Sequence, residues 1–429
     1  MRDLLEFRRR PLELLDRCGR APDPVVELRI RSRAYVLKTA EDLRHVIVSG
    51  ADAYEKSPRV VGERAQRAGG RGVIFRPSGQ EHGRARAILQ PSFGRNAVAS
   101  VADEMVRSVE RALESWAEDA PVDLAAEATN LSFRTMLRGV FGTSPEEAPE
   151  LVEGIRLRRR FVERGVRALF PRPRFVPVTV KPSARRQLAR LDAALDELVR
   201  RERSRDARPS SLLGELVAER KVSTDAQDEA ELRNQLVTIG MTGYLTVAMA
   251  LTWALYELSR DRDLATRLEA EVDSLDGGRL SAKALDSLPF TGTVVSESLR
   301  LYPPSWLFMR TVRVDDELPS GAILRSGGKV LISPYLVHRS AAYYDEPQLF
   351  DPDRFAPGAV AGRPRFAYLP FGGGRRVCIG REFALVQLNL ALARLVRSAR
   401  FDLVSGQAEL DPHIVLRPRD PIRVQVTRR

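Results

Sequence analysis

Residues 366–397 read FAYLPFGGGRRVCIGREFALVQLNLALARLVR, and the rest of the chain is organised around this stretch. A glycine-rich turn, Gly372–Gly374, leads to a single cysteine, Cys378. Behind it, apolar residues recur at helical spacing from Phe383 to Leu395, which predicts that Cys378 lies at or just before a helix N-terminus. Unpaired backbone N–H groups and the positive end of the helix dipole meet there, and both favour a thiolate over a thiol.

The neighbours of Cys378 favour a large, flat, anionic ligand. Gly374 and Gly380 lack a Cβ atom, so the backbone can approach such a ligand closely. Arg376, two residues before the cysteine, adds a fixed positive charge. A thiolate, close-packed backbone and a cation together suit a haem iron with ionised propionates. The alternative interpretation is a buried structural cysteine after a flexible turn.

Five residues of this stretch carry a resemblance to a known family. Phe371, Gly374, Arg376, Cys378 and Gly380 match the haem-binding signature FxxGxRxCxG, so the chain resembles the cytochrome P450 family. The resemblance implies a mainly α-helical fold with small accessory β-sheets, and haem b with an axial thiolate from Cys378. It further implies cofactor contacts from Phe371, Gly372, Arg376, Ile379, Gly380 and Ala384.

A second motif lies in TGTVVSESLRLYPP, where Glu297 and Arg300 stand three apart on one helix face before a double proline. Such a pair alone is weak in a chain that is 29% charged. Beside the cysteine motif it is similar to the family's structural ion pair, with Arg354 in DPDRF as the third member. A buried network of this kind supports the cysteine loop without doing chemistry.

A third pattern lies in the uncharged run from Asn234 to Tyr256, which we expect to be one buried helix rather than a membrane span. Asn234, Thr238, Thr242 and Thr246 recur every four residues and form a polar stripe. Threonines at this spacing either bond back to the preceding turn or border a wet pocket.

The resemblance places residues 242–246, with Gly243, on the family's oxygen-binding groove. Thr246, and Thr242 as a second candidate, would then be catalytic, because Thr246 matches the threonine that assists proton delivery. The acid that normally precedes it is replaced by Leu245, which cannot relay a proton. Water, one of the two threonines or the substrate would then have to deliver the proton. Otherwise the enzyme would catalyse a reaction that depends less on proton delivery.

Further cofactor and substrate contacts follow from the resemblance. His82 and Arg86 stand four apart on one helical face and alone indicate solvated surface, but the family places this pair on a haem propionate. Arg310 matches the position that reaches the second propionate. The substrate-pocket candidates, which by themselves look like ordinary core, are Phe75, Tyr244, Leu245, Trp306, Leu307, Phe308, Met309 and Ile414.

The remaining organisation favours a single domain over residues 1–429. Short alternating segments near the N-terminus, in residues 308–332 and at the C-terminus predict small sheets. Residues 57–80 predict a long loop near the ligand. The proline-broken stretch 171–182 joins two helices and resembles the family's lid over the substrate channel.

Composition narrows the function classes. The net charge is +12 and only six of the 69 basic residues are lysine, but the arginines are dispersed and no nucleic-acid module is visible. Two cysteines and no signal peptide favour a reducing cytoplasm without stable membrane insertion. We expect a monomer.

The activity we expect is monooxygenation: one atom of O₂ enters a hydrophobic small molecule, in specialised metabolism. Without a flavin or nicotinamide module, electrons would come from a ferredoxin-type donor and its reductase. Arg84, Arg375, Arg376 and Arg381 are the predicted docking face. Two alternatives stay open: an atypical P450 that couples, desaturates or uses peroxide, and a haem- or ligand-binding protein without turnover.

Overall fold

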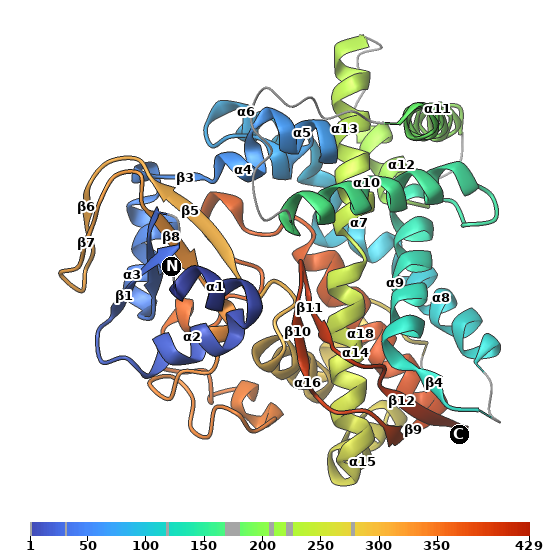
Figure 1. The fold of residues 1–429 in the computed structure, drawn as a ribbon. Helices are drawn as coiled ribbons and strands as arrows, with labels where there is room; N and C mark the ends of the chain where they lie inside the picture. Colours follow the sequence, from blue (N-terminus) through green and yellow to red (C-terminus); the bar gives the residue numbers. More distant parts are fainter. Residues whose placement is uncertain are drawn as a thin grey trace.

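The computed structural model describes residues 2–30, 32–116, 120–167, 181–205, 210–219, 226–275 and 279–429. Helices dominate these ranges and small sheets accompany them, which confirms the expected fold class. In Figure 1 the N-terminal helices and the largest sheet occupy one side, and the long helices the other. Most of the proline-rich connector, residues 171–180, lies outside the described residues.

The helical elements differ widely in length. The longer helices are α1 (Arg2–Arg9), α2 (Pro11–Arg20), α5 (Glu63–Gly69), α6 (Gln80–Leu89), α7 (Arg95–Ser100), α8 (Ala102–Ser115), α9 (Leu124–Phe141), α10 (Pro149–Arg167), α11 (Pro182–Arg203), α12 (Leu212–Glu219), α13 (Ala226–Thr242), α14 (Leu245–Arg260), α15 (Arg262–Asp273), α16 (Pro289–Leu301) and α18 (Arg381–Ser398). The shorter ones are α3 (Ala40–Arg44), α4 (Pro58–Val61), α17 (Pro334–Val337), η1 (His45–Ser49), η2 (Ala51–Ala53), η3 (Val73–Phe75), η4 (Pro91–Phe93), η5 (Ala284–Ser287), η6 (Pro352–Phe355), η7 (Arg365–Ala367) and η8 (Gly374–Arg376).

The largest sheet is five-stranded with the order β1-β2-β8-β5-β3. Its first two strands form the hairpin that the N-terminal alternation predicts. At its other edge β3 pairs antiparallel with β5, and Lys56 lies directly opposite Arg310. The strands of this sheet are β1 (Val25–Ile30), β2 (Ser32–Leu37), β3 (Tyr54–Lys56), β5 (Phe308–Val312) and β8 (Lys329–Ile332).

The smaller sheets join distant parts of the chain. The C-terminal strand β12 lies between β4 and β9, so the expected terminal strand is confirmed. The remaining strands are β4 (Val122–Asp123), β6 (Asp316–Glu317), β7 (Ile323–Leu324), β9 (Ala399–Ser405), β10 (Leu410–Pro412), β11 (Leu416–Pro418) and β12 (Arg423–Arg428).

The central helical column is interrupted where the sequence predicts one continuous helix. α13 ends at Thr242 and α14 begins at Leu245, with a turn at Gly243 and Tyr244 between them. The Gly243 N–H donates to Ile239 O at 2.8 Å, and a Cβ on Gly243 would lie 2.8 Å from that same oxygen. The break therefore depends on the missing side chain.

This column is part of the protein core. The run Gln227–Arg260 is long and apolar enough to cross a bilayer, but 78% of its most apolar window is buried inside the protein. α14 packs against α9, α16 and α18 (Figure 1). The prediction of a buried helix is therefore confirmed for its environment, although not for its continuity.

Residues 57–80 are not the long loop that their glycines and prolines predict. They form α4, α5 and η3, because Gly69 leaves room for Phe75: a Cβ there would lie 2.1 Å from the Phe75 ring. The segment is fastened to α13 by Arg71 N–H on Asn234 Oδ1 at 3.2 Å and by Val73 N–H on Gln235 Oε1 at 2.8 Å.

Candidate active site

The loop before Cys378 is held in one shape by its own backbone. Gly372 and Gly374 adopt left-handed conformations, with φ of 68° and 61°. The Cys378 N–H donates to Phe371 O at 2.9 Å. A Cβ on Gly374 would lie 2.2 Å from Ile47 O in η1, so the loop packs backbone to backbone against that turn. Glycine at 374 is thus required both by conformation and by space.

Cys378 lies just before α18, as predicted. Gly380 is the N-terminal cap residue of the helix, and its carbonyl accepts from Ala384 N–H at 2.8 Å. The Cys378 side chain is accessible although α18 is a core helix. Phe371, Ile379 and Ala384 around it are half-buried and pack against the main core.

The helix terminus is one of two opposing influences on the Cys378 thiol. Protein atoms packed around the sulfur desolvate it although the residue reaches the surface, and this raises the pKa of the thiol more than the Gly380 backbone N–H and Arg86 lower it. A thiol in this position ionises when it coordinates a metal cation. The loop would therefore present the Cys378 sulfur to a haem iron, and coordination would favour its thiolate form.

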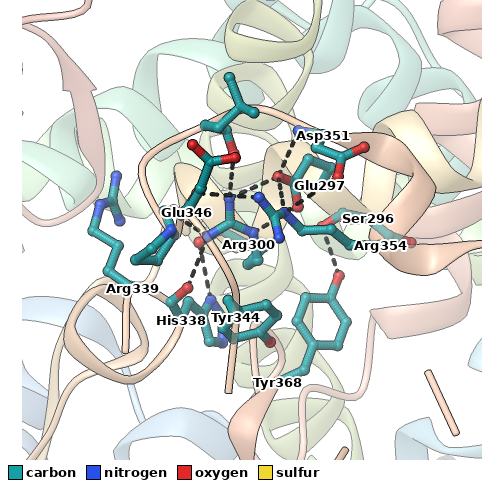
Figure 2. Close-up of polar contacts among 12 residues, drawn as sticks. Ser296, Glu297, Arg300, His338, Arg339, Tyr344, Glu346, Asp351, Arg354 and Tyr368 are labelled. Atoms are coloured by element: carbon teal, nitrogen blue, oxygen red, sulfur yellow. Dashed lines mark hydrogen bonds and ion pairs between the residues drawn. The ribbon is translucent and has the colours of Figure 1, made fainter. Parts of the chain in front are cut away.

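The predicted ion-pair network is assembled in full behind the loop (Figure 2). Glu297 and Arg300 are completely buried and form two hydrogen bonds of 2.6 Å each. Arg300 also donates to the carbonyls of His338, Pro347 and Leu349 at 2.8, 2.8 and 2.9 Å. The Arg354 guanidinium lies 3.6 Å from Glu297.

His338, which sequence reasoning missed, lies beside Arg300 (Figure 2) and connects this network to the cysteine loop through Leu369. Its Nε2 accepts the N–H of Leu369 at 2.9 Å, so the proton is on Nδ1, which contacts Arg300 O at 3.1 Å. Burial lowers the pKa of His338 to about 3, and the ring is neutral near pH 7. Leu369 O in turn accepts from Gly372 N–H at 3.0 Å. The only sequence signal was scarcity, since the chain has four histidines.

Positive charge accumulates on the other side of the loop. Burial lowers the pKa of Arg310, and burial together with Arg310 lowers that of Arg376 to about 10. Burial, and then Arg376, Arg86 and other cations, lower the pKa of His82 to about 4. Arg86 itself donates to Val377 O at 2.7 Å, next to the cysteine.

Lys56 is a further member of this group, the cationic set, which we define as Lys56, Arg86, Arg310 and Arg376 together with the neutral His82 beside them. Burial, and then Arg376 and Arg310, lower the pKa of Lys56 to about 7, and its Nζ donates to Ile74 O at 2.7 Å. Two cations directly opposite on paired strands repel each other. Nothing in the sequence around Lys56 indicated this role.

The cationic set fits the haem that the resemblance implies. Within the described ranges no carboxylate forms an ion pair with any of its members, and buried charge of one sign needs a counter-charge. Two haem propionates would supply it. The described residues contain no cluster of three metal-ligating side chains, so the iron would take one protein ligand, Cys378.

The polar stripe on the central helices divides into two kinds of residue. Thr238 Oγ1 donates to Asn234 O at 3.0 Å, and Thr242 Oγ1 donates to Thr238 O at 2.8 Å, as the back-bonding interpretation predicts. Thr246, in the first turn of α14, forms no such bond among the described residues and is half-buried. Its hydroxyl is therefore available to a ligand, beside Leu245 and Gly243.

The substrate-pocket candidates are scattered among several elements. Phe75 lies in η3, and Tyr244 is 4% exposed and packs edge-on against Phe133. Trp306 Nε1 donates to His413 O at 2.7 Å, which places the turn containing exposed Ile414 beside it. Leu307 and Met309 pack against the N-terminal core and Phe308 against the core of the large sheet.

The predicted docking face is only partly external. Arg84, Arg375 and Arg381 are exposed, and Arg375 pairs with Asp52 at 2.8 Å. Arg376 turns inward and donates to Arg76 O at 2.9 Å, because it belongs to the buried cationic set.

Comparison with known proteins gives consistent matches along nearly the whole chain. A family model described as Cytochrome P450 matches residues 3–426. The cyclooctatin synthase of Streptomyces melanosporofaciens is 34% identical over 93% of this chain and 87% of that protein. The pentalenene oxygenase of Streptomyces avermitilis is 30% identical over 98% and 93%. A crystal structure of a cytochrome P450 (CYP102L1) shares the fold, with a TM-score of 0.82 at 22% identity over 98% of this chain and 94% of that one.

Proposed function

The chain belongs to the cytochrome P450 family of haem-thiolate monooxygenases, and we propose that it oxygenates a hydrophobic cyclic terpenoid in specialised metabolism. It would act as a monomer and a single domain in the cytoplasm. The observation that carries the assignment of the site is the cysteine loop facing a cationic set without a carboxylate partner in the described ranges.

The chain's own residues have separable tasks in this proposal. Cys378 would hold the haem iron, and Lys56, His82, Arg86, Arg310 and Arg376 would hold its propionates. When bound, the haem activates O₂ for insertion of one oxygen atom into the substrate. Thr246 would hold a water or hydroxyl proton in the oxygen groove, since its own hydroxyl makes no back-bond there.

The substrate class rests on the relatives. One is named for oxygenation of pentalenene, a terpene hydrocarbon, and another for synthesis of cyclooctatin. A terpenoid core has few polar groups, which agrees with a candidate pocket of Phe75, Leu307, Phe308, Met309 and Ile414.

A ferredoxin-type protein with its reductase is the electron donor we propose. Arg84, Arg375 and Arg381 are exposed around the cysteine loop and would attract an acidic partner. Exposed charges are screened within about 8 Å at physiological ionic strength, so reduction should slow as salt rises. A reduction rate independent of salt would contradict this docking face.

Two measurements test the proposal in order. The dithionite-reduced protein under carbon monoxide should give the red-shifted Soret band of thiolate ligation, and Cys378→Ala should lose it. Turnover of pentalenene and related cyclic terpenes under ¹⁸O₂, with ferredoxin and reductase, should then give products labelled with one ¹⁸O atom. A thiolate spectrum without any terpenoid product, labelled or unlabelled, would overturn the substrate class and leave the haem site standing.

Leu245 favours a second candidate function within the family. Without an acid at this position the enzyme would couple or desaturate its substrate, or use peroxide, in reactions that depend less on proton relay. Product analysis separates the two, because desaturated or coupled products contain no ¹⁸O. If Leu245→Glu gave a large gain in hydroxylated product, the native enzyme would lack an alternative proton path of its own.

A further inference from the structure

α10 packs against α13, the helix that ends at the break in the central column (Figure 1). A pocket of about 240 Å³ lies beside this break. Residues of α9 and α10 and Tyr244, which lies in the break, form its wall. The lining residues are Thr129, Asn130, Phe133, Arg156, Arg159, Arg160 and Tyr244. Neither Cys378 nor the cationic set at the haem site lines this pocket; Tyr244, which the resemblance assigned to the substrate pocket, lines this one.

The pocket has an excess of positive charge. Arg159 is paired with Glu163 at 2.5 Å. Arg156 and Arg160 have no carboxylate partner among the described residues. Three arginines and one glutamate leave a formal charge of about +2, which suits an anion with two negative charges. The Arg156 guanidinium is fixed over the Phe133 ring, 5.7 Å from its centroid.

Tyr244 contributes a hydroxyl group that is free to bind a ligand. The residue is 4% exposed, and its ring packs against Phe133 with centroids 4.8 Å apart. Its hydroxyl nevertheless has no hydrogen-bond partner among the described residues and is not enclosed by protein atoms. A buried phenol normally finds a partner, so this one is left for a ligand in the pocket.

A solvated arginine face is the simplest alternative, and it does not account for the pocket. Arg156 and Arg160 are exposed, but they line one concavity together with Tyr244, whose hydroxyl is bonded by no described residue. A volume of 240 Å³ corresponds to about eight water molecules at ~30 Å³ each, enough for a phosphate or diphosphate group. Arginine forks and a hydroxyl donor match the oxygens of such a group.

We propose that this pocket binds a small molecule through a phosphate or diphosphate group, held by Arg156, Arg160 and the Tyr244 hydroxyl. The group belongs either to a free metabolite or to a lipid headgroup. A bound phosphate would join α10 to Tyr244, the residue that caps α14 just before Leu245 and Thr246. The inference is independent of the substrate proposed above.

Calorimetric titration of the ferric holoenzyme with inorganic diphosphate, with sodium chloride holding the ionic strength constant, tests the site. We expect saturable binding at one site per chain. Arg156→Gln with Arg160→Gln should weaken it at least about tenfold, and Tyr244→Phe about threefold. Arg200→Gln with Arg201→Gln removes the same charge from the outer face of α11 and should leave the affinity unchanged.

Vesicle flotation distinguishes the two sources. Binding to vesicles with phosphatidic acid, but not to phosphatidylcholine alone, and its loss in the Arg156/Arg160 variant would assign the group to a lipid. Diphosphate binding without flotation would assign it to a soluble metabolite. The proposal is overturned if neither probe binds saturably, or if the pocket variants and the α11 control lose affinity equally. Unchanged carbon monoxide spectra of the variants verify that they are folded.

Discussion

Replacing Lys56 by methionine should stabilise the protein without haem and weaken its hold on haem. In the protein alone, burial and the neighbouring arginines lower the pKa of Lys56 from 10.5 to about 7. A downward shift of ~3.5 units corresponds to at most about 5 kcal/mol of destabilisation at ~1.4 kcal/mol per unit. Water reaching the half-buried amine reduces this, and we expect about 2–4 kcal/mol.

The extra stability of the Lys56→Met apoprotein over the wild type should decrease as pH rises. Below about pH 7 the amine is protonated in both the folded and the unfolded apoprotein, so the full penalty applies and the substitution gains most. Between pH 7 and 10.5 the unfolded chain holds a proton that the folded apoprotein lacks, and the wild-type apoprotein becomes more stable as pH rises. The advantage of Lys56→Met should therefore vanish near pH 10.5.

With haem bound the sign reverses, because the propionates supply the missing counter-charge. Losing one charge-assisted hydrogen bond of about 1.5–3 kcal/mol should speed haem transfer to apomyoglobin about 10- to 100-fold. Urea unfolding of the apoprotein at several pH values, and haem-transfer kinetics of the holoprotein, are the two assays. Lys38→Met is the matched control: Lys38 also donates to a carbonyl, that of Ala21, but no described cation lowers its pKa. If Lys56→Met destabilised apoprotein and holoprotein alike, Lys56 would be an ordinary structural residue and the reasoning would fail.

Three further predictions concern the buried network and the oxygen groove. Glu297→Gln should lower the free energy of unfolding of the holoprotein, measured in urea, by about 3–5 kcal/mol, because it leaves the buried Arg300 charge without its partner. Glu13→Gln, in an exposed ion pair, should cost less than about 1 kcal/mol. Equal small effects of the two substitutions would contradict the burial argument. Between pH 6.5 and about 3 the unfolded chain binds a proton on His338 that the buried ring of the folded protein does not, so the wild type loses stability as pH falls. His338→Gln should remove this contribution to the loss. An unchanged pH slope in acid unfolding would refute the assignment of His338 as neutral. Thr246→Val should divert several-fold more of the consumed reductant to hydrogen peroxide, measured against Thr242→Val, whose hydroxyl is already bonded to Thr238 O; the reverse order would assign the proton role to Thr242.

The motifs allowed prediction of the elements whose geometry is local. The glycine turn, Cys378 and the following helix are close in sequence, and so are Glu297 and Arg300, so spacing alone placed them correctly. The break at Gly243 was missed, because apolar periodicity continues through it and a single glycine inside a helical pattern is usually tolerated. The helices within residues 57–80 were missed for a related reason: glycines there make room for Phe75 and α13, which composition cannot distinguish from flexibility.

Contacts between distant segments could not be predicted from spacing. Lys56 meets Arg310 only because β3 pairs with β5, and His338 joins Arg300 to Leu369 only after α16, α17 and the cysteine loop have packed together. The desolvation that raises the pKa of the Cys378 thiol could not be predicted either, because it depends on the whole fold, while the helix terminus is visible in the sequence. The ligand residue and its glycine turn could therefore be predicted from the sequence, whereas the pKa shifts around them depend on tertiary packing.

The juxtaposition of Lys56 and Arg310 also has a consequence for how the protein is made in the cell. β3 is an edge strand of three residues, and its last residue faces a like charge across the ladder. Before the cofactor arrives, this pair of like charges weakens the pairing of β3 with β5, and the chain around it would be more open to proteases. Cofactor delivery would close it. Cellular haem supply would thereby influence how much of the newly synthesised chain survives.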